Sequence, residues 1–331
     1  MKALIEKLVS VPSPSGYESG IRDVIKETIK PFVDQVEVDA LGNLIARKGK
    51  QAANGKRIML AAHMDEIGVM VTHVDEQGYA RFTNLGAVFP RNTAGGRVRF
   101  LNGASGVIGM EPHTSAYSVP ALAKMFIDLG VDSAKDCPVQ IGDVAVFERK
   151  FEETNNRLVA KAIDNRAGVA VLIETLRQLK NGPNEIVAVF TVQEEVGARG
   201  AQTAAYGVDP DLGIVIDVTV AADTPKNTLT QVKLGGGPAV HIKDIGSIAT
   251  PEVSAWITKN AKQAKIPTQV SILTGGYTDA RSIQPSRGGV PTGGISIPCR
   301  YVHTPSEMVD LDDLHASVKL LTAMLSKTVI L

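Results

Sequence analysis

The chain has 331 residues, of which 44% are hydrophobic and 21% are charged, and its formal net charge is zero. This composition is typical of a globular protein with one large or two modest domains, and the balanced charge favours neither nucleic acid nor an anionic membrane as a partner. Cys137 and Cys299 are the only cysteines, which indicates a reducing compartment and provides no cysteine cluster for zinc. No apolar run approaches the ~18 residues of a membrane span, so we expect a soluble, cytoplasmic protein.

The first 70 residues indicate the beginning of an α/β domain. The opening MKALIEKLVSVPSPSG intersperses charges among apolar residues, as a short amphipathic helix does and a signal peptide does not. Helical spacing of isoleucine and valine predicts a second helix over 17–30, ended by Pro31. A hairpin is expected over 36–47, and the continuous apolar run RIMLAA (57–62) predicts a strand buried on both faces.

From about residue 73 to 157 the pattern changes. Short runs with strand character, such as GYARFTNLG and GGRVRFLNG, are interrupted by glycine, asparagine and proline. MFIDLG (125–130) indicates a short helix. This segment therefore predicts a small β-barrel or sandwich.

Helices and apolar strands alternate again from residue 165. Helices are predicted over 165–180, 251–266 and 311–329, and strands over 185–192, 212–218, 268–273 and 293–298. This alternation predicts an α/β domain with a central mixed sheet flanked by helices. We expect that domain to comprise residues 1–70 plus 158–331, interrupted by a β domain over 71–157.

Ionisable side chains follow the predicted strands. The positions are His63 and Asp65 after 57–62, Glu194 and Glu195 after 185–192, Asp217 near the end of 212–218, His303 after 293–298, and Asp164 at the start of a helix. Singly, each has an ordinary explanation, such as helix capping by Asp164. Ligands in open α/β sheets bind beyond the carboxyl ends of strands, so we expect the group to converge. So many carboxylates would repel one another without cations, and mixed histidine and carboxylate ligands suit zinc or a similar divalent metal.

A pair of metal ions about 3.5–4 Å apart would need a bridging carboxylate, and a water between them would still need a general base. Glu194 and Glu195 are adjacent at a strand end and point in different directions, so one can bind metal while the other acts as the base. They do not fit a glycosidase pair, whose carboxylates flank a bond at least about 5 Å apart. Along a strand His63 and Asp65 share one face, so Asp65 can orient the His63 ring.

The chain contains, in order, SPSGYE, AAHMDEIG, AIDNRAG, QEEVGARGA, IDV followed by DTP, GGYTDA and IPCRYVHTPSEM. This series resembles the tetrahedral aminopeptidases and glutamyl aminopeptidases, family forty-two of the metallopeptidases, and the resemblance covers the chain from end to end. It implies a phosphorylase/hydrolase-like catalytic domain interrupted by a small β-barrel dimerisation domain. It also implies dimers assembled into a hollow homododecamer that admits peptides.

The resemblance implies a role for each of the residues named above. Asp164 would bridge two divalent ions, zinc or cobalt, with His63 and Asp217 completing one site, Glu195 and His303 the other, Glu194 as general base and Asp65 orienting His63. The implied reaction removes N-terminal residues from peptides by attack of a bridging water. Tyr277 stands where the family often has a third glycine, and no departure of this kind removes a ligand.

Other dinuclear hydrolases use the same ligand types. A carboxypeptidase, a dipeptidase or an N-acyl amino acid deacylase is the alternative, and an arginine that binds a substrate carboxylate would favour it. Arg300 is the candidate for that role. A non-catalytic scaffold protein would be expected to lack ligands, whereas all of the expected ligands are present.

Overall fold

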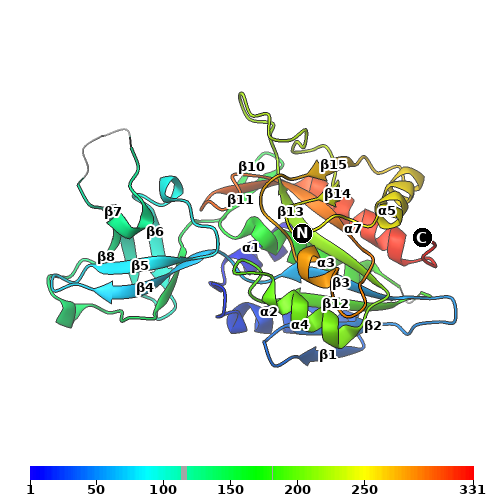
Figure 1. Cartoon of the computed structure of the whole chain (residues 1–331), viewed down its shortest axis with the longest axis horizontal. Helices are drawn as coiled ribbons and strands as arrows, with labels where there is room; N and C mark the ends of the chain where they lie inside the picture. The colour runs from blue at the N-terminus through cyan, green and yellow to red at the C-terminus, as the bar shows by residue number, and fades with distance from the viewer. Residues whose placement is uncertain (113–117, 181) are drawn as a thin grey trace.

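The computed structural model describes residues 1–112, 118–180 and 182–331. Figure 1 shows two parts, a closed β-barrel on the left and a larger sheet covered by helices on the right. This architecture confirms the predicted α/β fold with a mixed sheet and a small barrel. None of the helices in the described residues is both long and apolar enough to span a bilayer.

The larger part is built on an 11-stranded sheet. Its main order is β1 (Gln35–Val38), β2 (Leu44–Lys48), β12 (Glu185–Thr191), β3 (Arg57–His63), β13 (Leu212–Val220), β16 (Thr292–Arg300), β17 (Glu307–Asp310), β11 (Arg157–Ala160) and β10 (Glu152–Thr154), with β14 (Ala239–Lys243) paired to both β16 and β15 (Gln269–Ile272). The four central strands β12, β3, β13 and β16 run parallel, whereas β2, β14 and β17 pair with them antiparallel. The parallel strands therefore end at one edge of the sheet.

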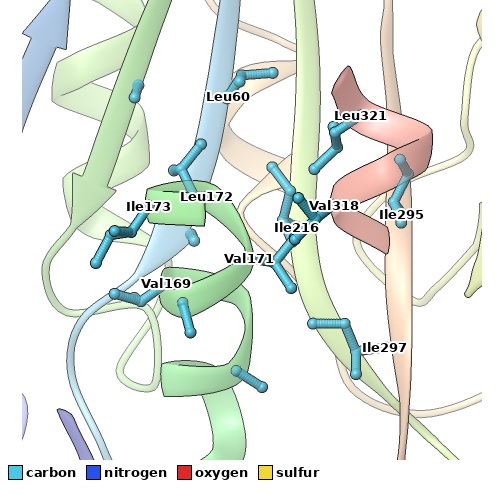
Figure 2. Close-up of a cluster of buried hydrophobic side chains, with 14 of the residues drawn as sticks. Leu60, Val169, Val171, Leu172, Ile173, Ile216, Ile295, Ile297, Val318 and Leu321 are labelled. Atoms are coloured by element: carbon cyan, nitrogen blue, oxygen red, sulfur yellow. The ribbon is translucent and has the colours of Figure 1, made fainter. Parts of the chain in front are cut away.

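Helices cover both faces of this sheet. One face carries α1 (Lys2–Val9), α2 (Ser19–Ile29), α3 (Ile163–Gln178), α5 (Pro251–Gln263) and α7 (Leu311–Leu325), and the other carries α4 (Arg199–Val208) and α6 (Ala280–Ile283). The middle of β3 is apolar at successive positions because both faces of the strand are buried. Leu60 packs into the hydrophobic cluster under α3 and α7, whereas Met59 and Ala61 pack into the cluster under α4 and α6 on the other face. Figure 2 shows the cluster that contains Leu60, where α3 packs on β3 and β13 and α7 packs on β16.

The smaller part closes into a barrel in the order β4 (Gly68–Val74), β5 (Ala80–Leu85), β8 (Met125–Asp128), β7 (Ser105–Met110), β6 (Arg97–Phe100) and β9 (Val144–Phe147). Side chains that alternate along these strands fill it, among them Val69, Phe82, Val98 and Ile108. Short 3₁₀ helices η1 (Lys30–Phe32), η2 (Pro90–Asn92), η3 (Leu122–Lys124) and η4 (Ala134–Asp136) complete the structure.

The helix expected over 125–130 is wrong, because this segment forms strand β8. Met125 and Ile127 point into the barrel while Asp128 is exposed, so the segment has the two-residue period of a strand. Helices α4 and α6 and strands β10, β11, β14 and β17 were not predicted.

Candidate metal centre

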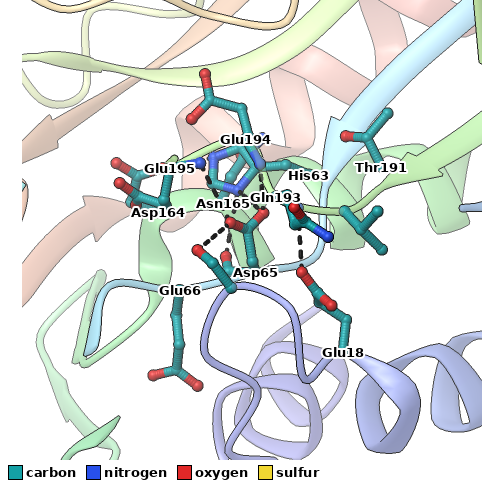
Figure 3. Close-up of polar contacts among 12 residues, drawn as sticks. Glu18, His63, Asp65, Glu66, Asp164, Asn165, Thr191, Gln193, Glu194 and Glu195 are labelled. Carbon is teal, nitrogen blue, oxygen red and sulfur yellow. Dashed lines mark hydrogen bonds and ion pairs between the residues drawn. The ribbon is translucent and has the colours of Figure 1, made fainter. Parts of the chain in front are cut away.

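Side chains from the carboxyl ends of the central strands converge on one pocket of about 470 Å³. The lining includes His63 from β3, Asp217 from β13, Asp164 from the start of α3, Glu194 and Glu195 after β12, and His303 after β16. The parallel strands bring these residues together from positions far apart in the chain. Asp65, the remaining residue of the expected site, is fully buried beneath them (Figure 3).

Five of these side chains form two groups with the geometry of metal ligands, and Asp164 belongs to both. In the first group, His63 Nε2 lies 3.1 Å from Asp164 Oδ1 and 3.7 Å from Asp217 Oδ1. In the second, His303 Nε2 lies 3.3 Å from Asp164 Oδ2 and 3.5 Å from Glu195 Oε2. Each oxygen of the Asp164 carboxylate therefore faces a different histidine.

The electrostatics of this cluster show how strongly its charges interact. Burial raises the pKa of Glu195 to about 8, although His303 nearby opposes the shift. Burial works against a charged His303, but Glu195 and Asp164 raise its pKa to about 10. Buried carboxylates beside imidazoles form a donor set that fits a divalent first-row metal ion, which would replace the protons these groups otherwise hold.

Asp65 holds both His63 and the segment that carries the two glutamates. Its Oδ1 lies 3.4 Å from His63 Nδ1 and accepts the backbone N–H of Glu194 at 3.0 Å. Its Oδ2 accepts the backbone N–H of Glu195 at 3.1 Å and the hydroxyl of Ser15 at 2.6 Å. Figure 3 shows these contacts as dashed lines around Asp65. A carboxylate suits this position, because the Ser15 hydroxyl and the backbone N–H groups of Glu194 and Glu195 all donate to it.

Glu194 differs from Glu195 in that it belongs to neither ligand group. It is buried, it lines the pocket, and its Oε1 has no hydrogen-bond partner among the described residues. Burial raises the pKa of Glu194 well above its usual range. The side chain is thus placed to exchange a proton with a molecule in the pocket.

The start of α3 is shaped by Asn165 and not by Asp164. Asn165 Oδ1 accepts the backbone N–H of Gly168 at 3.0 Å, and its Nδ2 donates to the carbonyl oxygen of Ile216 at 2.8 Å. A Cβ at Gly168 would lie 2.6 Å from that same carbonyl oxygen, so glycine is needed for α3 to approach β13. This leaves the Asp164 side chain free to face the two histidines.

Two further buried acids support the centre and were not predicted. Glu307 accepts the backbone N–H of Asp164 at 2.9 Å and that of His303 at 2.8 Å. Glu66 follows Asp65 in the sequence. Its carboxylate accepts two hydrogen bonds of 2.7 Å from Lys161 Nζ and one of 3.0 Å from the backbone N–H of Ser13. Both acids lie inside motifs already noted, HTPSEM and AAHMDEIG, but their partners are distant in sequence or are backbone groups.

The barrel also reaches the pocket. Ala87 and Phe89 line it, and the Phe89 ring stacks on His303 with centroids 6.4 Å apart. At Gly86 a Cβ would lie 2.9 Å from Glu195 Oε2, so the barrel backbone passes directly beside this glutamate. Arg300, in contrast, forms a two-point ion pair with Asp223 at 2.8 and 2.7 Å and is not among the residues lining the pocket.

Histidine and carboxylate ligands clustered at the strand ends of an α/β sheet are typical of metal-dependent hydrolases. A family model described as M42 glutamyl aminopeptidase matches residues 42–320. A putative aminopeptidase of Acetivibrio thermocellus is 46% identical over 321 residues, which is 96% of this chain and 96% of the relative. The chain belongs to the M42 family and is a metal-dependent aminopeptidase, as its motifs indicated.

Solved structures agree with this assignment. Aminopeptidase APDkam598 from the archaeon Desulfurococcus kamchatkensis superposes with a TM-score of 0.94 at 39% identity, over 98% of this chain and 94% of that one. The TET1 peptidase of Pyrococcus horikoshii, which can assemble into a tetrahedron or a large octahedral shell, gives 0.87 at 33% identity over 99% of each chain.

Proposed function

We propose that this aminopeptidase uses two divalent metal ions, zinc or cobalt, and that Asp164 bridges them. His63 and Asp217 would complete one site, and Glu195 and His303 the other. The observation that carries the proposal is the placement of the Asp164 oxygens, which lie 3.1 Å from His63 Nε2 and 3.3 Å from His303 Nε2. When bound, the ions supply Lewis acidity and a water whose pKa is lowered toward about 7.

Glu194 is proposed as the general base. Its carboxylate would take the proton of the attacking water and return it to the leaving amine, as one group serving as base and then acid. Its position in the pocket and its unpartnered Oε1 support this role. Asp65 is proposed as a positioning residue that orients His63, supported by the 3.4 Å contact to Nδ1.

The pocket favours a substrate with a free amine over one with a free carboxylate beside the cleaved bond. None of the described residues that line the pocket is an arginine or lysine, and four carboxylates lie there, those of Asp164, Glu194, Glu195 and Asp217. Arg300 was the candidate for binding a carboxylate, but its guanidinium is held by Asp223. These facts support an aminopeptidase against the carboxypeptidase and deacylase alternatives.

We further propose that the β-barrel, expected over 71–157 and built from strands between Gly68 and Phe147, forms a dimerisation domain, that dimers assemble into a homododecamer, and that the particle is cytoplasmic. The TET1 peptidase supports assembly, and the barrel exposes apolar side chains at Leu101, Val107 and Ile141 that a subunit contact would cover. Light scattering coupled to gel filtration measures the assembly directly. A mass of twelve chains would support the dodecamer, a larger mass would favour an octahedral shell, and one or two chains would contradict both.

The reaction is tested with aminoacyl p-nitroanilides and their N-acetylated counterparts, after reconstitution with zinc or cobalt and again with chelator. We expect release that needs metal and occurs only from the free amines. Release from the acetylated compounds, or none from any free amine, would overturn the proposal.

A further inference from the structure

The pocket has apolar walls outside the metal centre. Among the described residues that line it, all except His63, Asp164, Glu194, Glu195, Asp217 and His303 have uncharged side chains, and four of these are threonines. The larger apolar side chains among them include Phe89, Val218, Val220, Leu229, Leu273, Tyr277 and Val302. They come from the barrel, from β13, from the loop after β13, from the segment after β15 and from the segment before His303, so apolar surface faces the metal centre from several directions.

Two arginines lie against this wall without being part of it. The guanidinium of Arg281 is 4.4 Å from the centroid of the Tyr277 ring, and that of Arg91 is 5.7 Å from the centroid of the Phe89 ring. Tyr277 and Phe89 line the pocket, whereas neither arginine does. Each positive charge is thus held on an aromatic ring by a cation–π contact.

Two glycines, Gly275 and Gly276, precede Tyr277 in the loop that lines the pocket. A Cβ at Gly275 or Gly276 would meet no atom within 4 Å, so the two glycines leave open space in this loop. The Tyr277 hydroxyl lies 3.4 Å from the carbonyl oxygen of Glu194, so the ring extends toward the proposed base. A smaller residue at position 277 would remove the ring that the Arg281 guanidinium contacts. It would also leave space in the pocket for that guanidinium.

We propose that the pocket selects peptides whose N-terminal residue is uncharged and apolar, and that Tyr277 sets this selectivity by keeping Arg281 out of the pocket. This inference rests on the proposed aminopeptidase reaction. Among the described residues of the wall, an acidic N-terminal side chain would meet no cation and a basic one no carboxylate outside the metal centre, so either would be desolvated without a partner. Leucine and methionine side chains would instead bury apolar surface.

The test compares kcat/KM for leucyl, methionyl, glutamyl and lysyl 7-amido-4-methylcoumarins, with the metal-loaded wild type and four variants. Tyr277→Gly removes the ring, Tyr277→Phe keeps it, Arg281→Ala removes the charge, and Tyr277→Gly/Arg281→Ala removes both. Metal content and thermal midpoint are recorded for each variant, so that a fold or metal defect is recognised. Calorimetric binding of free leucine and free glutamate provides a readout that does not depend on turnover.

We expect the wild type, Tyr277→Phe and Arg281→Ala to prefer leucyl over glutamyl and lysyl substrates by about tenfold or more. Tyr277→Gly should narrow the leucyl-to-glutamyl ratio by about tenfold, whereas the double variant should not gain glutamyl activity. A wild type that is active but prefers glutamyl or lysyl substrates would overturn this inference alone. A leucyl-to-glutamyl ratio unchanged in Tyr277→Gly would overturn the role of Tyr277. Inactivity on every free amine would instead overturn the proposed reaction, and this inference with it.

Discussion

The carboxylate of Asp65 fixes the backbone of Glu195, with Oδ2 accepting its N–H at 3.1 Å. The other oxygen of Asp65 accepts the N–H of Glu194 and lies 3.4 Å from the His63 ring. One fully buried acid therefore sets the position of a proposed ligand, of the proposed base and of a ligand on the neighbouring strand. It links the ends of β3 and β12, which lie side by side in the sheet.

Asp65→Asn should weaken metal binding by roughly 10–100-fold, as changes in residues that orient metal ligands do. An asparagine offers one acceptor oxygen, and its NH₂ group would face donors in place of the second. Competitive titration of the metal-free protein with a chromophoric chelator measures the effect. Ser15→Ala is the matched control, because it removes only the 2.6 Å hydroxyl contact and leaves Oδ2 with the Glu195 N–H. Equal losses in the two variants would contradict the orienting role.

Glu194→Gln should lower kcat by about 10²–10⁴-fold while metal content stays at the wild-type value. Glutamine has the same shape but cannot accept the proton at neutral pH, and Glu194 belongs to neither ligand group. Steady-state kinetics together with elemental analysis of the purified variant check both parts. Activity within about tenfold of the wild type would assign the base elsewhere.

Metal binding should release protons near neutral pH. Without metal, the pKa of His303 is raised to about 10 and that of Glu195 to about 8, so both groups hold protons at pH 7. A metal ion must displace these protons, so affinity should rise as pH increases from 6 toward 8. Calorimetry of zinc binding in buffers of different ionisation enthalpy counts the protons released. An affinity independent of pH over this interval would contradict the ligand set.

The central strands were predictable because residues 58–62 (IMLAA) and 186–190 (IVAVF) are apolar without interruption, as strands buried on both faces are. The convergence of His63, Asp164, Glu194 and His303 was also predictable, since parallel strands end at one edge. The strand β8 was not predictable, because four residues are too few to distinguish the two-residue period of a strand from a helical period. The Leu129-Gly130 pair that follows is also typical of the end of a helix. The support from Glu307 was hidden because its partners are backbone amides, which sequence does not reveal.

The two cysteines should differ in reactivity. Cys299 is fully buried, and burial raises the pKa of its thiol well above the usual range, so it stays protonated and covered. Cys137 is partly exposed. Iodoacetamide at pH 8 should therefore label Cys137 in the native protein, and Cys299 only after denaturation. Peptide mass mapping separates the two sites, and rapid native labelling of Cys299 would mean that β16 is more accessible than the structure indicates.

Glu307→Gln should weaken both proposed metal sites at once. The two carboxylate oxygens of Glu307 accept the backbone N–H groups of Asp164 and His303, so this side chain positions the shared ligand and a ligand of the second site. Glutamine would satisfy one amide and set its own NH₂ against the other, which costs about 1–3 kcal/mol when the group is buried.

Chemical denaturation of the metal-free protein measures the loss of stability in Glu307→Gln, and stepwise zinc titration measures the two affinities. Asp217→Asn is the comparison, since Asp217 belongs to the first ligand group alone and its loss should weaken one site more than the other. If Glu307→Gln lowered stability but left both affinities at wild-type values, Glu307 would hold the loop without positioning the ligands. A fall in both affinities, with only one weakened strongly in Asp217→Asn, would mean that a single buried carboxylate sets the spacing of the dinuclear site through backbone amides.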